Sequence, residues 1–418
     1  MLGVMTSYPV VSNAPVAGIG SIAARALTAE FARHNAATSA IVVGADPSSL
    51  VVAAAVEALL PGDTLTLVAG ERGTTDLLRD HITGLGSWIA DRVKVVDSLD
   101  ECQPAGVVIV GEPVTGTADE VRVLLDRLGK YLTDGAVVTL ATPAVPGRTG
   151  GAAAELFRQS ALFGVGSDLV VRNRPPLRVH KLRFSPAEPA VAGTLAPAYR
   201  PSSVPLIGGM HIDSNGVAAA GIALGLAALA RTARPKSKLW LLPALLAGPV
   251  AAFFRDPERD IPEDPAAVVA ASDGRVLSVE RLADERFGTG EFLRVAVFLS
   301  VLDVHVNRVP VAGRVADYFV EDGGYANAMT AAAEHNVAAY TVLDTEHGKV
   351  VVAQRTGLIA RRIVQRVPVG TLVARGERMG LIRFGSRTDI YLPADRAEPL
   401  VGVGDKVIGG SSVIARWL

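Results

Sequence analysis

The feature that most constrains the fold is a regular alternation of short apolar runs with helical patterns between residues 40 and 145. The runs are rich in Val, Ile and Leu, and they read SAIVVGA, DTLTLVAGE, RVKVVDSL, AGVVIVGE and GAVVTLATP. Runs of this length that alternate with helices are typical of a parallel sheet covered by helices on both faces. The sequence therefore predicts a Rossmann-like, doubly wound α/β domain over residues 1–184, in which residues 150–186 add a helix and a terminal hairpin.

The loop after the first run, VGADPSSL, contains one glycine, Gly44. Close approach of a ligand to such a loop usually needs several glycines. The order of elements resembles the Rossmann-like fold of class I S-adenosylmethionine-dependent methyltransferases, in which Glu71 would bind the ribose. We expect no catalytic function in this domain, and a lipid methyltransferase remains an alternative.

Composition bounds the remaining possibilities. A chain of 418 residues is long enough for two hydrophobic cores. A net charge of -1 argues against a nucleic-acid partner, which normally needs a basic excess. The single cysteine, Cys102, excludes an internal disulfide and a multi-cysteine zinc site, and it suits a reducing compartment. The N-terminus has no basic segment before an apolar run, so we expect no secretory signal.

A proline-rich stretch over residues 185–205 has the composition of a linker, and two apolar runs follow it at 216–230 and 239–254. The connector RTARPKSK between these runs carries four cationic residues. Each run is shorter than the roughly 20 residues of a spanning helix. Basic residues beside apolar helices favour an anionic membrane surface, so we predict a membrane-associating helical hairpin over residues 206–255. A buried hairpin of a soluble core is the alternative.

From residue 256 the chain changes to short strands with glycine-rich turns, which predicts a mainly β domain over residues 256–418, either a barrel or a sandwich. The phrases VPVGTLVARGE and VGVGDKVIGGSS resemble the hairpins of a lipoyl-type barrel. They lack a lysine at a carrier-type hairpin tip, so a swinging-arm carrier is not expected.

Five phrases in this half resemble those of a known family: FFRDPERDIP, ASDGRV, FLSVLDVHVNRVPVAGRV, GLIARRIV and RGERMGLIRFGSRTDIYLP. Their order and spacing closely resemble the phosphatidylserine decarboxylase proenzymes, specifically the short, membrane-associated branch. The resemblance runs from about residue 204 to residue 418.

The resemblance implies that the chain cuts itself between Gly385 and Ser386. Glycine tolerates unusual dihedral angles and leaves room for attack by the serine Oγ on its carbonyl. Elimination and hydrolysis would then leave a pyruvoyl group derived from Ser386, which would be the covalent cofactor. Decarboxylation of an α-amino acid needs an electron sink, and this carbonyl would provide one through a Schiff base with the lipid amine.

The resemblance also implies roles for two further residues. His305, in LDVHVNR, would handle protons, since an imidazole titrates near neutral pH. Asp273, in ASDGRV, would help to activate the cleaving serine, although an ordinary Asp-Gly turn is the competing interpretation. In the long branch of the family a second histidine follows three residues after the first, and here that position is Arg308. Which base activates Ser386 is therefore open.

Cations near these motifs are candidates for contact with lipid phosphate or carboxylate, because guanidinium groups suit both. They are Arg361, Arg362, Arg383 and Arg387, and a solvated strand edge is the alternative role for each. A departure lies at AAAEHNVAAYTV, where relatives carry an acidic-Asn-Glu-Arg phrase. This chain keeps Glu334 and Asn336 but lacks the arginine.

The sequence thus predicts a self-processing, pyruvoyl-dependent carboxy-lyase that converts phosphatidylserine to phosphatidylethanolamine and CO2. We expect it at the cytoplasmic face of the cell membrane, as a peripheral or monotopic homo-oligomer of processed large and small chains. The alternatives are a bifunctional decarboxylase and lipid methyltransferase, and an unprocessed membrane-binding scaffold.

Overall fold

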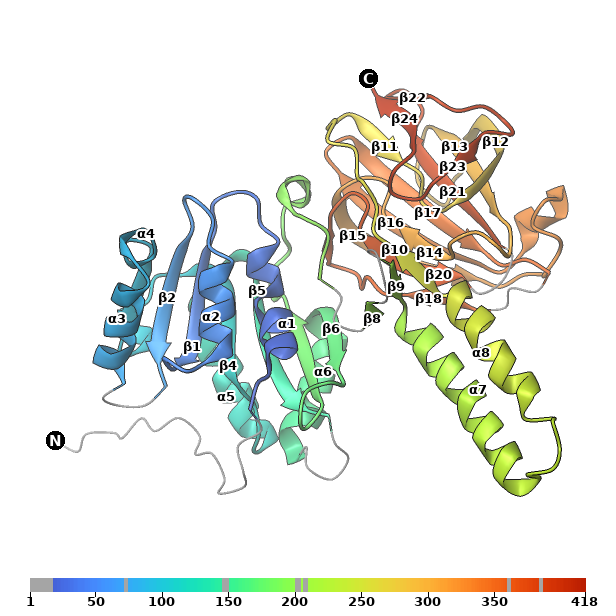
Figure 1. The fold of residues 1–418 in the computed structure, drawn as a ribbon. Helices are drawn as coiled ribbons and strands as arrows, with labels where there is room; N and C mark the ends of the chain where they lie inside the picture. The colour runs from blue at the N-terminus through green and yellow to red at the C-terminus, as the bar shows by residue number, and fades with distance from the viewer. Residues whose placement is uncertain are drawn as a thin grey trace. The chain divides into compact units, whose positions relative to one another are not determined.

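The structure is a computed structural model that describes residues 18–70, 74–144, 150–199, 204–205, 210–358, 362–382 and 386–418 (Figure 1). The chain divides into two compact units. The first comprises residues 1–188 and 194–201, and the second comprises residues 189–193 and 202–418. Each unit has its own hydrophobic cores.

In the described part of the first unit, seven strands form one sheet in the order β3-β2-β1-β4-β5-β7-β6. These strands are β1 (Ser39–Ala45), β2 (Thr64–Ala69), β3 (Val93–Val96), β4 (Ala105–Pro113), β5 (Leu132–Pro143), β6 (Gly164–Val170) and β7 (Leu177–Leu182). Strands β1 to β5 pair in parallel, whereas β7 is antiparallel to both of its neighbours. The predicted terminal hairpin is therefore present.

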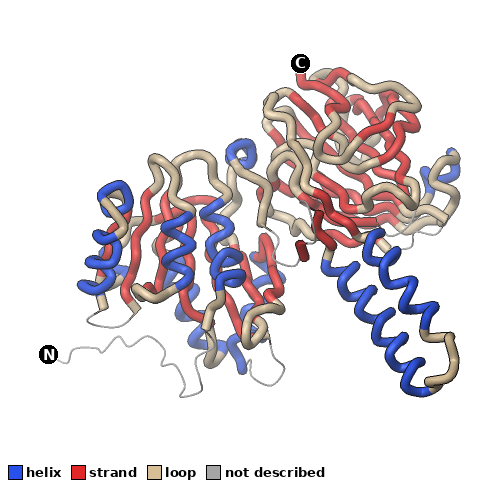
Figure 2. The backbone as a smooth tube through the Cα atoms, viewed as in Figure 1, coloured by secondary structure: helices blue, strands red, loops and turns tan. Residues whose placement is uncertain are grey.

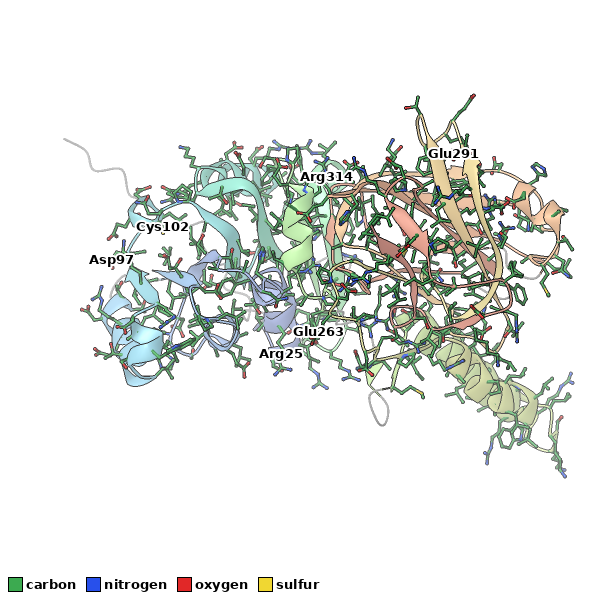
Figure 3. All side chains as sticks on the ribbon, turned by 90° about the horizontal axis from the view of Figure 1, so that it is seen from above. Arg25, Asp97, Cys102, Glu263, Glu291 and Arg314 are labelled. Carbon is green, nitrogen blue, oxygen red and sulfur yellow. The ribbon has the colours of Figure 1, made fainter. Side chains whose placement is uncertain are left out.

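Helices cover both faces of this sheet (Figure 2). They are α1 (Ser21–Ala32), α2 (Leu50–Glu57), α3 (Thr75–Gly84), α4 (Ser87–Ala90), α5 (Ala118–Gly129) and α6 (Gly150–Phe163). Residues of α1, α2 and α3 share a core with one face, and residues of α5 and α6 share a core with the other. The arrangement confirms the predicted Rossmann-like sheet. Cys102, which Figure 3 labels, is buried in the core that also contains residues of α5 and α6.

The second unit begins with a helical hairpin (Figure 1). Helix α7 (Ser214–Ala233) packs along α8 (Leu241–Phe253), and the strands β9 (Met210–Ile212) and β10 (Arg255–Pro257) pair at their base. Strand β8 (Val204–Pro205) adds to β9. At the base, Gly216 lies so close to Phe254 that a Cβ atom on the glycine would be 2.5 Å from the Phe254 Cβ.

The rest of this unit is mainly β, as predicted. Its described residues form an eight-stranded sheet in the order β19-β15-β16-β17-β21-β13-β12-β23 and two three-stranded sheets, β11-β24-β22 and β14-β20-β18. The strands of the large sheet are β12 (Gly274–Ala283), β13 (Glu291–Leu299), β15 (Gly313–Glu321), β16 (Ala338–Thr345), β17 (Gly348–Arg355), β19 (Leu372–Val373), β21 (Ser386–Pro393) and β23 (Lys406–Val407). Those of the small sheets are β11 (Ala267–Val269), β14 (Val306–Arg308), β18 (Ile363–Gln365), β20 (Arg378–Ile382), β22 (Ala397–Pro399) and β24 (Val413–Trp417). The resemblance to lipoyl-type hairpins stays a prediction.

Two cores lie on opposite faces of the large sheet. The main core joins Val297, Val352 and Ile390 to residues of the small sheets, such as Met379 and Ile414. The second core, on the other face, contains aromatic side chains, among them Tyr340 and Tyr391. Because successive side chains of a strand point to opposite faces, a residue's position in its strand decides which core it meets.

Candidate active site

Ser386 is the first residue of β21 and lies opposite Leu299, the last residue of β13. Its side chain is fully buried, and its Oγ has no hydrogen-bond partner among the described residues. A buried polar group that lacks a partner costs about 1–3 kcal/mol, so such groups are rare in folded proteins and usually have a function. The open hydroxyl therefore marks Ser386 as a candidate nucleophile.

The direction of the Ser386 side chain follows from the alternation along β21. Ser386 and Ile390 are on the face of the main core, whereas Arg387 and Tyr391 are on the face of the second core. Any group derived from Ser386 thus belongs to the inner face, between the large sheet and the small sheets.

His305 directly precedes β14, and its backbone carbonyl accepts a hydrogen bond from the Ile382 amide at 3.3 Å. Ile382 is the last residue of β20, and Ser386 follows it by four positions. Together with the Leu299–Ser386 pair, this bond brings the loop 300–304 and the start of β21 to the same end of the unit.

The imidazole of His305 is buried and fixed. Its Nδ1 lies 2.9 Å from the backbone oxygen of Asp303, and its ring lies 4.2 Å from the ring of Phe253, at the end of α8. Donation from Nδ1 to the Asp303 carbonyl leaves the basic lone pair on Nε2. Burial lowers the pKa of His305 from the ordinary 6.5 to about 4. At neutral pH the ring is therefore an uncharged base.

Four further polar residues, fully buried, extend this face; we call Ser272, Asn307, Gln354 and Thr388 the polar layer. Gln354 Nε2 donates to Asn307 Oδ1 at 2.6 Å, and the hydroxyls of Ser272 and Thr388 are 2.7 Å apart. Gln354 is directly opposite Thr388 in the sheet.

Sequence reasoning missed this polar layer, although two signals pointed to it. Asn307 follows His305 by two residues, the spacing that places two side chains on one side of a strand. Gln354 is a lone amide in the apolar run VVVAQ. A polar residue in such a run, on the buried side of a strand, needs a partner or a function.

The contacts of Asp273 differ from those of the acid in a catalytic triad. Its carboxylate accepts hydrogen bonds from Arg259 Nη2 and from the Gly409 amide, both at 2.8 Å. The residue before it, Ser272, is the one that reaches the polar layer. A role of Asp273 in maturation stays a prediction.

Arg308, at the position of the second histidine in the long branch, is a buried structural cation. Its Nη2 donates to Asp256 at 3.0 Å and to the Pro257 carbonyl at 2.8 Å, while Nη1 donates to the Gly376 carbonyl at 3.1 Å. Burial lowers its pKa to about 10, so the group stays charged at neutral pH. Arg308 therefore does not serve as a base, and His305 is the buried imidazole that the described residues place at this end of the unit.

Two of the four candidate arginines and the residue before Ser386 lie outside the described residues: Arg361, Arg383 and Gly385. Arg362 is exposed. Arg387 is buried on the second-core face, where it donates to Asp389 and, at 2.9 Å, to Glu334. Contact of these arginines with the substrate stays a prediction.

The altered phrase around Glu334 also belongs to the second-core face. Glu334 accepts hydrogen bonds from Arg294 at 2.8 Å and from Arg387, and although burial raises its pKa, these arginines lower it below the ordinary value. Asn336 bonds the backbone of Ala326 and Thr356. Both retained residues thus stabilise this face of the sheet.

The base of the helical hairpin contacts the loop before His305. Besides the Phe253 ring, Arg255 donates from Nη1 to the Ala252 carbonyl at 3.2 Å and from Nη2 to the Leu302 carbonyl. Asp213, the N-cap of α7, forms an ion pair with Arg366. The hairpin is therefore anchored at both of its ends, and its α8 end lies next to the histidine.

In the first unit, Gly44 lies near the carboxyl end of β1, and the side chain of Glu112 packs against it. Gly44 has a positive φ of 77°, and a Cβ atom built on it would lie 3.5 Å from Glu112 Cγ. The Glu112 side chain thus lies against the glycine at the carboxyl end of the strands, where α/β sheets usually bind ligands. Glu71 lies outside the described residues.

Comparison with known proteins finds a family and relatives that match the second half of the chain. The family model described as "Phosphatidylserine decarboxylase" matches residues 246–415. A phosphatidylserine decarboxylase proenzyme of Symbiobacterium thermophilum is 48% identical over 182 residues, which are 42% of this chain and 84% of the relative. One of Desulfotalea psychrophila is 43% identical over 166 residues, 39% of this chain and 77% of the relative.

Among solved structures, similarity is found to methyltransferases. The mitomycin 7-O-methyltransferase MmcR is 18% identical with a TM-score of 0.29, over 40% of this chain and 55% of that one. The glycopeptide N-methyltransferase MtfA, complexed with sinefungin, is 12% identical with a TM-score of 0.31, over 42% of this chain and 99% of that one. TM-scores this low carry no conclusion about function.

Proposed function

The chain belongs to the phosphatidylserine decarboxylase family, and from this premise we propose that it cuts its own peptide bond before Ser386 and works with the pyruvoyl group that the cut leaves there. Its reaction removes the head-group carboxylate of phosphatidylserine as CO2 and yields phosphatidylethanolamine. The observation that carries the proposed cut is the buried Ser386 hydroxyl, which is unpartnered among the described residues and lies within the matched region.

The cut starts when Ser386 Oγ attacks the carbonyl carbon of Gly385. The Oγ–C bond forms, the C–N bond breaks, and the hydroxyl proton passes to the released nitrogen, so that an ester replaces the amide. Loss of the Ser386 Cα proton then breaks the Cβ–Oγ bond and frees a large chain that ends in the Gly385 carboxylate. Water displaces the nitrogen of the remaining dehydroalanine as ammonia, and the small chain begins with the pyruvoyl group.

The residues around Ser386 fit a group of this kind. The position is buried on the inner face, where water is excluded, and its hydroxyl is available for the first bond. When formed, the pyruvoyl carbonyl supplies the electron sink that decarboxylation of an α-amino acid requires. Phosphatidylserine provides the amine that meets this carbonyl.

We assign the proton transfers to His305. Its uncharged ring, with Nδ1–H directed at Asp303, accepts the Ser386 hydroxyl proton at Nε2 and passes it to the released nitrogen. In the later decarboxylation it takes a proton from the ammonium group of the lipid and delivers it to the carbon that has lost CO2. Asp273 is proposed to support maturation indirectly. It holds Gly409 by a hydrogen bond, and Gly409 packs against Ser272, whose hydroxyl reaches Thr388 of the polar layer.

The test of self-cleavage is the intact mass, under denaturing conditions, of the purified wild-type chain and of Ser386→Ala. The wild type should give two chains, the smaller of which spans residues 386–418 and carries a pyruvoyl mass in place of serine. Ser386→Ala should give one full-length chain, because the nucleophile is missing.

Ser411→Ala is the matched control, since Gly410-Ser411 is another Gly-Ser pair in the same unit. It should cleave like the wild type. A wild-type chain that stays whole, even with membranes present, would favour the scaffold alternative, and cleavage of Ser386→Ala would move the site to another residue.

The exposed hairpin is proposed to attach the enzyme to the cytoplasmic face of the cell membrane, as a peripheral or monotopic protein. Helix α7 has 20 residues and is, by length and composition alone, apolar enough to cross a membrane. Helix α8 has 13 residues, which at about 1.5 Å per residue fall short of the roughly 30 Å hydrocarbon core. The connector carries Arg231, Arg234, Lys236 and Lys238, which suit anionic head groups. Because α8 is too short to return the chain across the bilayer, entry of the hairpin into one leaflet fits better than a hairpin of two spanning helices.

The first unit is proposed to have no catalytic function. The support is the Glu112 side chain against Gly44, at the edge of the sheet where a cofactor would approach. Among the described residues of this unit, no contact favours methyl transfer over that interpretation. The experiment that separates the two concerns the whole molecule and is described below.

A further inference from the structure

The polar layer beside Ser386 contains an amide pair that is only half satisfied. Gln354 Nε2 donates to Asn307 Oδ1 at 2.6 Å, and both side chains are fully buried. Among the described residues, Asn307 Nδ2 and Gln354 Oε1 have no hydrogen-bond partner. One donor and one acceptor of the pair are therefore unpaired. If both amide groups were turned over, the pair would still have one unpaired donor and one unpaired acceptor, each on the other residue.

The amide pair and Ser386 share one face. Gln354 is directly opposite Thr388, and Thr388 follows Ser386 by two residues, so the three side chains point to the same side of the large sheet. Thr388 itself is satisfied by Ser272. Ser386 and the polar layer together thus hold three polar atoms that lack a partner among the described residues: Ser386 Oγ, Asn307 Nδ2 and Gln354 Oε1.

Three open atoms in one buried layer need a reason, because each costs about 1–3 kcal/mol when it stays unpaired. Donors that are fixed in advance where negative charge develops stabilise a transition state without having to reorient. The attack of Ser386 Oγ creates such a charge on the carbonyl oxygen next to it, and the amide pair holds the open NH2 group of this layer.

We propose that the open NH2 of the Asn307–Gln354 pair donates to the oxygen that becomes negative when Ser386 Oγ attacks the peptide bond before it. As the Oγ–C bond forms, the carbonyl electron pair moves to this oxygen; it returns when the C–N bond breaks and the nitrogen takes the hydroxyl proton. In the amide orientation of the structure, Asn307 acts as the catalytic donor, and Gln354 is a positioning residue that fixes the Asn307 amide. The inference rests on the proposed self-cleavage.

The test follows cleavage of the full chain over time by intact mass, during cell-free synthesis with anionic vesicles. Asn307→Asp keeps the shape but replaces the NH2 by a carboxylate oxygen, and Asn307→Leu removes both polar groups. Both should slow cleavage at pH 7 by about 10²–10³-fold, the usual effect of losing one oxyanion donor. Gln354→Met should slow it less, because the donor remains but is no longer held.

Gln365→Met is the matched control, since Gln365 also leaves its Oε1 without a described partner but bonds Thr341 on another strand. It should cleave within about threefold of the wild type, well inside the 10²-fold loss of an oxyanion donor. A second readout separates a donor from a structural role. In Asn307→Asp a protonated carboxyl regains an O–H donor, so cleavage should recover as the pH falls towards 5.

Three results would overturn the inference while leaving the proposed function intact. They are a folded Asn307→Leu that cleaves like the wild type, slow cleavage of Asn307→Asp that does not recover in acid, and a loss of cleavage in Gln365→Met equal to that in Asn307→Leu. A wild-type chain that stays whole would overturn both proposals.

Discussion

At the scale of single residues, the side of a strand decides what a residue can do. Ser386 and Arg387 are neighbours in sequence, yet one faces the main core and the other forms ion pairs with Asp389 and Glu334 in the second core. A cation next to a candidate nucleophile in sequence is thus not automatically at the substrate. Asn307, which is distant in sequence, bonds Gln354 on the same face of the sheet as Ser386.

The Phe253 ring gives a prediction about His305. Removing it in Phe253→Ala opens the buried imidazole to water, so the pKa of His305 should rise from about 4 towards 6.5. The imidazole of His305 also loses the ring that packs against it. Decarboxylation per cleaved chain should therefore fall by about 10²-fold, as expected for a misplaced catalytic group. The pKa is measured by NMR titration in a Ser386→Ala background, and the rate in detergent micelles.

Phe253→Leu keeps most of the side-chain bulk. Its His305 pKa and its decarboxylation rate should therefore lie between those of the wild type and those of Phe253→Ala. Cleaved His305→Ala should lose about 10²–10⁴-fold in decarboxylation, and normal turnover of that protein would refute the assignment of His305. The pH dependence of stability follows the same shift. Because folding lowers this pKa, the unfolded chain binds the proton more tightly, so the contribution of His305 to stability is complete above pH 6.5 and is lost as the pH falls towards 4.

Motif resemblance was enough to select Ser386 and His305, because both lie in phrases with fixed spacing. The partners of these residues could not be predicted in the same way. The Asp273–Arg259 pair, the Arg308–Asp256 pair and the polar layer join residues about 14 to 116 positions apart, and which of these meet depends on how the sheets pack.

At the scale of elements, the hairpin of α7 and α8 is the most unusual part of the second unit. Leu229 and Leu245 are 66% and 72% exposed, although both are among the most apolar side chains. The two helices could be predicted from the sequence, since each coincides with one of the two apolar runs. It could not show that they project from the unit, because a buried hairpin has the same composition.

Leu229→Glu with Leu245→Glu should therefore weaken binding to vesicles that contain anionic lipid by about 10²–10⁴-fold, as each leucine loses about 1.5–3 kcal/mol of apolar burial. Co-sedimentation with phosphatidylglycerol vesicles measures this. Val123→Glu is the control, because Val123 is 68% exposed on α5 of the other unit. Unchanged binding of the double variant would contradict the membrane role of the hairpin.

At the scale of the whole molecule, the chain carries two units with separate cores. The doubly wound sheet could be predicted because its strands read as continuous apolar runs. The pairing order of the eight-stranded sheet could not, because it joins strands far apart in the chain, such as β13 and β21. One unit belongs to an established enzyme family, and the other is argued to have no catalytic function of its own.

This division predicts two thermal transitions in the full chain. Leu67→Ala, in the core under α1 to α3, should lower one transition, and Leu343→Ala, in the main core, should lower the other. Each substitution costs about 2–5 kcal/mol of stability, which lowers the transition temperature by roughly 5–15 °C for a unit of this size.

S-adenosylmethionine should raise the temperature of neither transition, since a ligand stabilises only the unit that binds it. Scanning calorimetry with and without the ligand tests this, and Leu67→Ala should decarboxylate normally at 25 °C. A ligand-dependent rise of the transition that Leu67→Ala lowers would restore the bifunctional alternative, whereas a joint shift of both transitions would mean that the two cores unfold as one.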